Sequence, residues 1–206
     1  MTTIVVIAKA PVAGRVKTRL CPPCSPEGAA RIAAAALADT LASVGRAACD
    51  ARVVALDGAP GPWLPSGFTV VPQVGGGLGE RLAAAVDAVG GPVLVVGMDT
   101  PQLTPSLLDL ACDHLGASST DAVLGPATDG GYWSIGFRHR RRDAFRGVPM
   151  SSRDTGARQR ARLAELGLRV HELQMLRDVD TIADARAVAA KIPDSEFARA
   201  VAEVSA

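Results

Sequence analysis

The sequence predicts an α/β protein built on a largely parallel sheet, and three observations support this prediction. Apolar runs of strand length, without polar alternation, are typical of parallel strands buried on both faces. Segments with apolar residues at helical spacing lie between these runs. The chain has 206 residues, 48% of them hydrophobic, which suffices for one sizeable domain that we expect to span residues 1–206. The apolar runs lie at residues 4–8, 52–56, 93–96 and 121–125.

The other elements are expected from shorter signals. Ser25 and Pro26 form a helix start, as N-cap and first helical residue, and Thr104 and Pro105 repeat that pattern. Additional strands are expected at residues 68–71, after Gly131 and at residues 168–173, and additional helices over residues 82–89 and 157–166, after Thr181 and around residues 197–204.

Composition excludes several classes of function. The formal net charge is +1 and the basic residues are clustered, so we expect neither nucleic acid nor a membrane surface as a partner. The run Arg138–Arg142 lacks interleaved aromatic residues and is typical of a solvated face. No signal peptide or membrane-spanning run is evident, so we expect a soluble cytoplasmic protein. Cys21 and Cys24 have the spacing of a redox pair or half a zinc site, but incidental thiols are favoured because no second such pair exists.

The first apolar run ends in a basic loop. Lys9, Arg15, Lys17 and Arg19 lie close together around Pro11 and Gly14. Ligands of open α/β sheets bind outside the carboxyl ends of the strands, and clustered cations repel one another unless an anion relieves them. The loop is therefore predicted to hold a polyanion such as a nucleotide triphosphate, the alternative being a solvated turn.

The run at residues 93–96 ends in Gly97 and then presents Asp99 at its carboxyl end. That position suits a metal ligand, although an aspartate capping its own turn would fit as well. The segment Gly75–Gly79 contains four glycines, which allow backbone N–H groups to approach a ligand before the next helix, or simply form a flexible connection.

Three later segments carry further candidates. Asp129, Gly130 and Gly131 precede Tyr132, a pattern that predicts a hairpin or bulged turn, or else an acceptor pocket cleared by the glycines. Residues 151–156 precede a basic helical stretch, so their hydroxyls and amides would bind an anion or cap the helix. Thr181 and Asp184 resemble a capping box, which leaves Asp178 and Asp180 unexplained.

These segments, in their order along the chain, resemble the motifs of known enzyme families. Ala8-Lys9, the segments 16–20 and 97–103, Ser151-Ser152-Arg153 and the segment 177–181 together resemble the phospholactate/phosphoenolpyruvate guanylyltransferase group of small nucleotidyltransferases. The segment 125–132 is more similar to a sister family of uncharacterised glycosyltransferase-like proteins, some associated with arsenosugar biosynthesis. Both groups share the nucleotide-diphospho-sugar transferase fold, GT-A. The resemblance implies a three-layer α/β/α arrangement with a mixed, mainly parallel sheet, and a nucleotide over its amino-terminal half.

The resemblance also implies roles for residues. Lys17, Arg19 and Asp99 are expected to be catalytic, and Asp99, Asp178 and Asp180 to hold Mg²⁺ or Mn²⁺. The nucleotide is expected to be held by Ala8, Lys9, Gly14, Arg15, Lys17, Arg19 and Gly79. The acceptor is expected at Asp129, Gly130, Gly131, Tyr132, Ser151, Ser152 and Arg153.

Two reactions are compatible with these residues. The favoured one is Mg²⁺-dependent transfer of a nucleoside monophosphate from a triphosphate to a phosphorylated or carboxylated small molecule, which needs cations and metal rather than a nucleophilic side chain. The alternative is glycosyl transfer from a nucleotide sugar, at the same metal site. A homodimer is compatible with either, and neither the base nor the acceptor is identified by the sequence.

Overall fold

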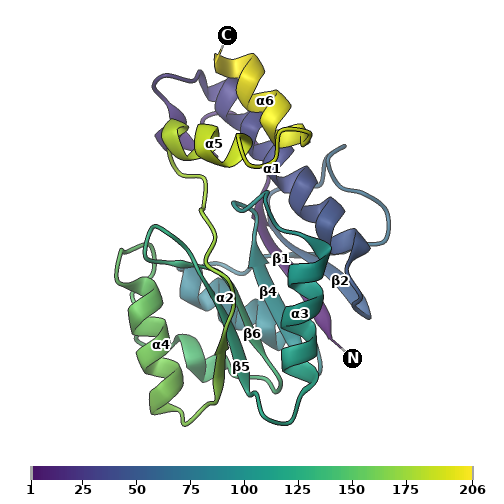
Figure 1. The fold of residues 1–206 in the computed structure, drawn as a ribbon, viewed down its shortest axis with the longest axis vertical. Helices are drawn as coiled ribbons and strands as arrows, with labels where there is room; N and C mark the ends of the chain where they lie inside the picture. The colour runs from purple at the N-terminus through teal and green to yellow at the C-terminus, as the bar shows by residue number, and fades with distance from the viewer. Residues whose placement is uncertain (1, 206) are drawn as a thin grey trace.

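The computed structural model describes residues 2–205 and contains a seven-stranded sheet, whose central strands appear in Figure 1 as roughly vertical arrows. The order across the sheet is β3-β2-β1-β4-β6-β5-β7. β6 runs antiparallel to its neighbours β4 and β5, and the other neighbouring pairs are parallel. The predicted mixed, mainly parallel sheet is therefore confirmed. The strands are β1 (Thr3–Lys9), β2 (Ala51–Asp57), β3 (Thr69–Pro72), β4 (Val93–Gly97), β5 (Ala122–Pro126), β6 (Tyr132–Phe137) and β7 (Val170–Glu172).

Helices cover both faces of the sheet, which confirms the three-layer GT-A fold. On one face, Leu37 of α1 and Leu108 of α3 pack with Val6 of β1, and on the other Val86 of α2 and Leu163 of α4 are buried in a second cluster. Burial of apolar side chains against both faces is the main stabilising contribution to such a sheet. The helices are α1 (Pro26–Arg46), α2 (Leu78–Asp87), α3 (Pro105–Gly116), α4 (Thr155–Glu165), α5 (Ile182–Ala189) and α6 (Glu196–Ser205), with short 3₁₀ helices η1 (Thr18–Leu20) and η2 (Arg142–Phe145).

Helix starts were predictable because they depend on local hydrogen bonds. Ser25 Oγ accepts from the Gly28 amide at 3.1 Å, and Thr104 Oγ1 accepts from the Leu107 amide at 3.2 Å. The capping box of Thr181 and Asp184 is also present. These caps satisfy backbone N–H groups that have no partner within the helix.

Several predicted boundaries differ from the structure. α2 begins at Leu78, four residues before the predicted start, because Gly77 is the N-cap and the Glu80 side chain accepts from its amide. α4 begins at Thr155, two residues before the predicted start, because Thr155 closes the preceding turn: its hydroxyl donates to Pro149 O at 2.9 Å and accepts from Ser152 N at 3.0 Å. β7 is only three residues long, where the sequence predicts residues 168–173. It is an edge strand that pairs with β5 alone, so fewer backbone groups are fixed in the sheet.

A third apolar cluster anchors the end of the chain. Ile32 of α1 and Val188 of α5 are buried with Phe197 of α6, apart from the two clusters on the sheet. In Figure 1 these helices lie together at the top, and the segment between β7 and α5 crosses the sheet edge to reach them. The apolar contacts of α5 and α6 therefore fix the course of this segment, which contains Asp178 and Asp180.

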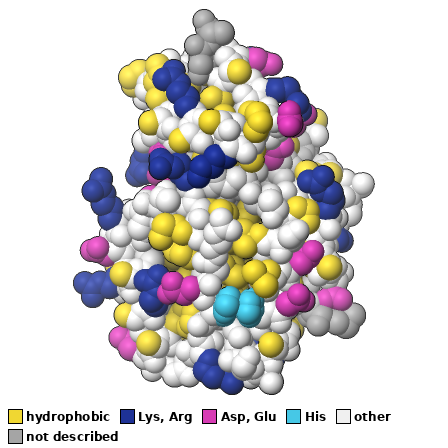
Figure 2. Space-filling model, viewed as in Figure 1, with side chains coloured by type: hydrophobic (Ala, Val, Ile, Leu, Met, Phe, Trp, Pro, Cys, Tyr) yellow, Lys and Arg dark blue, Asp and Glu magenta, His cyan; other side chains and the backbone are white. Residues whose placement is uncertain are grey.

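Charged side chains are dispersed on the surface in Figure 2, where Lys and Arg occur in separate groups with acidic residues among them. Within the basic run, Arg138 donates to Leu115 O and Gly116 O at the end of α3, and Arg142 lies 3.5 Å from Asp87. Among residues 2–205, helices with the length and apolar character needed to cross a bilayer are not found.

Candidate functional site

A cleft of about 1240 Å³ opens at the carboxyl ends of the central strands. β1 lies between β2 and β4 in the sheet. The chain continues from β1 to β2 and β3 on one side, and then crosses over to form β4 on the other side of β1. Such a switch point leaves a crevice above the strand ends, where ligands of α/β sheets bind. Ile7 and Lys9 of β1, Gly97 of β4 and Ser134 of β6 all line the cleft. The core strands thus form its floor.

The segment after β7 closes one side of this cleft. Val179 N donates to Asp99 O at 3.0 Å, and Gln102 Nε2 donates to Arg177 O at 2.6 Å. These bonds fix the late segment against the end of β4 and place Asp178 and Asp180 beside Asp99 in the cleft. The two aspartates left unexplained by capping therefore face the same space as the residue predicted from β4.

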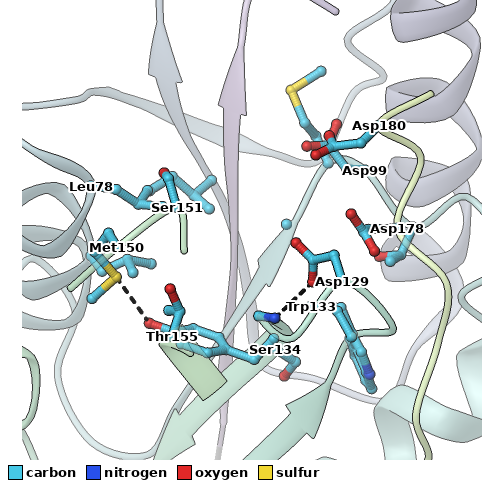
Figure 3. Close-up of a pocket in the computed structure, with 18 of the residues that line it drawn as sticks. Leu78, Asp99, Asp129, Trp133, Ser134, Met150, Ser151, Thr155, Asp178 and Asp180 are labelled. Carbon is cyan, nitrogen blue, oxygen red and sulfur yellow. Dashed lines mark hydrogen bonds between the residues drawn. The ribbon is translucent and has the colours of Figure 1, made fainter. Parts of the chain in front are cut away.

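Three carboxylates come close enough to share a cation. One oxygen each of Asp129, Asp178 and Asp180 lies within 4.8 Å of the others. Figure 3 shows them on one side of the cleft together with Asp99, with Leu78 and Ser151 on the opposite side. Asp129, predicted from the glycine-rich turn to contact the acceptor, thus lies with the predicted metal ligands, and this grouping has no signal in the local sequence.

The cations of the basic loop contact these carboxylates. Lys17 Nζ lies 2.8 Å from Asp99 Oδ1 and 3.5 Å from Asp180 Oδ1. Arg19 Nη1 lies 2.7 Å from Asp180 Oδ2. The structure therefore brings the predicted cations and carboxylates together, and it pairs them with one another directly.

Two pKa values are perturbed by this crowding. Burial and then the negative charges of Asp129 and Asp180 raise the pKa of Asp178 to about 6, against smaller lowering effects that include Lys17. Burial lowers the pKa of Lys17, but the charges of Asp99 and Asp180 and their hydrogen bonds outweigh it, so the net direction is upward. Lys17 thus stays an ammonium, while Asp178 is the carboxylate whose ionised form a bound cation would stabilise most directly.

We expect the metal-free protein to lose stability as the pH rises from about 4 to about 6 because of Asp178. Its pKa of about 6 in the folded chain lies above the ordinary aspartate value of 3.8, so the folded state binds the proton more tightly. The contribution of protonated Asp178 to the free energy of unfolding is therefore fully present below the unfolded pKa, and it is lost as the pH rises through the folded pKa of about 6. Melting temperatures of wild type and Asp178→Asn, measured at about pH 4 and about pH 6 in chelator, test this. The decrease in melting temperature on raising the pH should be larger in wild type than in Asp178→Asn. Equal decreases in both proteins would contradict this prediction.

The turn after β5 connects the carboxylate side of the cleft to the start of α4, near the opposite wall that contains Ser151. Gly131 N donates to Asp129 Oδ1 at 2.7 Å, and Gly156 N donates to Gly130 O at 2.8 Å, so the turn and the helix start are joined. β5 and β6 pair antiparallel across this turn, which confirms the predicted hairpin, and a register shift lies between Gly125 and Pro126 before it. The following residues, all predicted for the acceptor, line the cleft: Asp129, Gly130, Gly131, Tyr132, Ser151, Ser152 and Arg153.

The far end of the cleft contains polar residues that the sequence did not indicate. Arg81 Nη1 lies 3.0 Å from Asp57 Oδ2 and 3.2 Å from Gln73 Oε1. Gln73 Nε2 in turn donates to Ala8 O and Ala55 O at 2.8 and 2.9 Å, which ties β3 to β1 and β2. The sequence offered one signal for this group: Asp57 directly follows a buried strand. The prediction of Asp99 as a site residue rests on the same kind of position.

Two buried hydroxyls also line the cleft. Thr100 Oγ1 and Ser134 Oγ belong to residues only 1% exposed and have no hydrogen-bond partner among the described residues. Buried polar atoms of this kind are usually satisfied by water or by a ligand. The cleft therefore offers a bound molecule hydrogen-bonding capacity that the described residues leave unused.

Some predicted residues lie outside the cleft lining. Gly14 and Arg15 are exposed on the basic loop, Lys17 is buried behind Asp99 and Asp180, and Gly79 lies in the first turn of α2. The lining residues in the described chain include no histidine, and the rings of His114 and His171 stack on each other elsewhere, 3.4 Å apart between centroids. Ala8, Lys9 and Arg19 do line the cleft.

Comparison with solved structures supports the fold. A candidate nucleotide-diphospho-sugar transferase from Desulfovibrio desulfuricans G20 is 26% identical, with a TM-score of 0.88 over 98% of this chain and 94% of that one. Rv0371c from Mycobacterium tuberculosis H37Rv, solved as a complex with manganese, is 25% identical, with a TM-score of 0.53 over 91% and 96% of the two chains. CMP:2-keto-3-deoxy-manno-octonic acid synthetase complexed with CTP is 12% identical, with a TM-score of 0.62 over 93% and 98%.

Sequence comparison gives the family. A search of the curated proteins finds no match. The model of the family DUF2064, whose description is "uncharacterized protein conserved in bacteria", matches residues 31–152, which is more than half of the chain. That span includes the strands β2, β4, β5 and β6 and the aspartates Asp99 and Asp129. The protein is therefore a member of the DUF2064 family, with the fold of nucleotide-diphospho-sugar transferases.

Proposed function

We propose that this protein is a divalent-metal-dependent nucleotidyltransferase. It would move a nucleoside monophosphate from a triphosphate to a phosphorylated or carboxylated small molecule and release pyrophosphate. The observation that carries the proposal is the grouping of Asp129, Asp178 and Asp180 beside the cations of the basic loop, on one side of a cleft of about 1240 Å³. The same fold occurs in a synthetase that was solved with CTP.

The chemistry of the carboxylate cluster suits Mg²⁺ or Mn²⁺. Both prefer oxygen ligands, and Asp129, Asp178 and Asp180 each offer one at mutual distances within 4.8 Å. The raised pKa of Asp178 reflects burial and crowded negative charge that a divalent cation would relieve. Rv0371c, which is 25% identical to this chain, was solved with manganese. A bound ion would supply Lewis-acid stabilisation of phosphate charge.

The residues of the cleft would bind and orient the two substrates. Lys9 and Arg19 line it and are suited to neutralising phosphate oxygens. Ser151 at the opposite wall (Figure 3) and Ser152, which also lines the cleft, would orient the acceptor. An oxygen of the acceptor forms a bond to the α-phosphorus, and the bond from that phosphorus to the bridging oxygen of pyrophosphate breaks.

An anionic acceptor explains why no dedicated base is needed. A phosphate or carboxylate oxygen is already deprotonated near neutral pH, so no proton has to be removed as it attacks. The described lining residues include no histidine, the usual general base near neutral pH. This observation favours a phosphorylated or carboxylated acceptor over one that reacts through an alcohol.

Glycosyl transfer from a nucleotide sugar is the second candidate. The observation in its favour is the space beside the carboxylates, which is lined on the opposite side by the side chains of Leu78 and Met150 (Figure 3). The 26% identical structure from Desulfovibrio desulfuricans carries a nucleotide-diphospho-sugar transferase description. In this reaction the departing group would be a nucleoside diphosphate.

Product analysis separates the two candidates. The protein is incubated with Mg²⁺ or Mn²⁺, a panel of phosphorylated and carboxylated small molecules, and either each nucleoside triphosphate or each common nucleotide sugar. We expect release of pyrophosphate that requires a triphosphate, an acceptor and the metal together. Release of nucleoside diphosphate from a nucleotide sugar, without pyrophosphate from any triphosphate, would contradict nucleotidyl transfer and favour glycosyl transfer. Silence with both donor classes would contradict both.

A further inference from the structure

Lys17 is buried at the junction of three segments that are distant in the sequence. Its side chain is only 7% exposed, and its backbone is held in the left-handed region, with φ of 49°. Nζ donates to Val179 O and lies 2.8 Å from Asp99 Oδ1 and 3.5 Å from Asp180 Oδ1. The ammonium thus joins the basic loop, the end of β4 and the segment before α5.

The hydrogen-bonding capacity of Lys17 is fully used. An ammonium has three N–H donors and no acceptor. The three partners are Val179 O, Asp99 Oδ1 and Asp180 Oδ1. A phosphate oxygen could be bound by this group only if one of these contacts were broken, and the buried ammonium would then lose part of the charge compensation that the half-exposed carboxylates provide.

Arg19 differs from Lys17 in burial, although both come from the same loop. Its side chain is 71% exposed, and it contacts Asp180 Oδ2 at 2.7 Å from the solvent side. Exposed ion pairs contribute little to stability, so Arg19 can leave Asp180 at small cost. Its guanidinium can then bind phosphate oxygens in a bidentate manner.

We propose that the Lys17 ammonium is a built-in cation of the carboxylate centre, a positioning residue that occupies the place of a second divalent cation between Asp99 and Asp180. The centre then holds one metal ion. Arg19 is the residue of the basic loop that releases the Asp180 carboxylate and binds the phosphate of the nucleotide instead. This inference rests on the proposed function, because it presupposes that the carboxylates bind a divalent cation.

The test counts Mn²⁺ ions in the full chain by calorimetry and by electron paramagnetic resonance. Wild type should bind one ion with an isolated-ion spectrum. Lys17→Met, nearly equal in length but uncharged, should bind two ions with the broadened spectrum of two neighbouring Mn²⁺ centres, as in two-metal sites. Arg19→Met, the matched control in the same loop, should bind one. A folded Lys17→Met variant that binds a single ion would overturn the inference.

Nucleotide binding gives a second measurement. With Mn²⁺ saturating, Arg19→Met should weaken binding of the triphosphate by about tenfold or more, the effect of one lost charge-assisted hydrogen bond. Lys17→Met should change it by less than about threefold, because its ammonium makes no phosphate contact. Equal weakening in both variants would make Lys17 a phosphate ligand and overturn the inference.

A double variant covers the case in which Lys17→Met does not fold. Combining Lys17→Met with Asp99→Asn removes the cation together with one of its carboxylates, so no buried charge is left unpaired at that contact. This variant should fold and bind one Mn²⁺ ion, and binding of two ions would overturn the inference. If wild type itself binds no Mn²⁺, the proposed metal-dependent function fails, and that outcome is distinct from all of the above.

Discussion

Replacing Asp180 by asparagine is expected to lower turnover by about a thousandfold, because one preorganised electrostatic group in an active site contributes roughly that much. Asp180 belongs to the group of three close carboxylates, and it faces both Lys17 and Arg19. Asparagine keeps the shape of the side chain but removes its charge and one acceptor oxygen. The measurement is initial-rate kinetics of pyrophosphate release, or of nucleoside diphosphate release for the second candidate reaction, together with the dissociation constant of Mn²⁺.

The control for this prediction is Glu165→Gln. Glu165 is 66% exposed and pairs with Arg162 on the surface of α4, so the same loss of one negative charge occurs away from the cleft. Turnover and Mn²⁺ affinity should match wild type, since surface pairs contribute little. If Asp180→Asn retained wild-type Mn²⁺ affinity and rate, Asp180 would not be a metal ligand, and the proposed centre would have to be rebuilt on other residues.

Replacing Gly130 by alanine is expected to destabilise the protein by about 3 kcal/mol, which for a chain of this size lowers the melting temperature by roughly 10 °C. Gly130 has φ of 91°, and a Cβ at this position would collide with the carbonyl oxygen of Arg153. Relief of the collision requires the turn after β5 to move away from the start of α4. The hydrogen bond from Gly156 N to Gly130 O, now 2.8 Å, would then be lost.

Gly147→Ala is the matched control for the collision. Gly147 also has a positive φ, 75°, but an added Cβ there would meet no atom within 4 Å. It should cost only the conformational penalty of about 1 kcal/mol. The difference between the melting temperatures of the two variants measures the destabilisation caused by the collision with the Arg153 carbonyl alone. Equal losses would mean that the turn and α4 are free to separate. Gly130→Ala should also weaken Mn²⁺ binding, because Asp129 precedes it.

Much of the fold could be predicted because its signals are local. The buried strands read as apolar runs, and the caps at Ser25, Thr104 and Thr181 satisfy backbone groups within three residues. The predictions failed in detail where a contact with another segment sets the boundary. α4 starts early because Thr155 bonds to Pro149 O, and β7 stops early because it has one neighbour.

The candidate site could be predicted in part. Residues at strand ends, such as Asp99, follow from the rule that ligands bind outside the carboxyl ends of strands, and the structure places Asp178 and Asp180 beside it. The grouping of Asp129 with those two could not be predicted, because it depends on how far the turn after β5 leans toward the late segment. Gln73 and Arg81 were missed because their partners belong to other strands.

The sequence by itself determined the class of the fold, the positions of most elements and the types of charge available for chemistry, since these depend on side chains and backbone groups near one another in the chain. Only the tertiary structure decided which charge meets which. Lys17 contacts Val179 and Asp180, more than 160 residues away, and those contacts direct its ammonium to carboxylates. The physical reason is that an ionic contact is set by distance in space and by burial, and the packing of α1 against α5 and α6 brings these segments together.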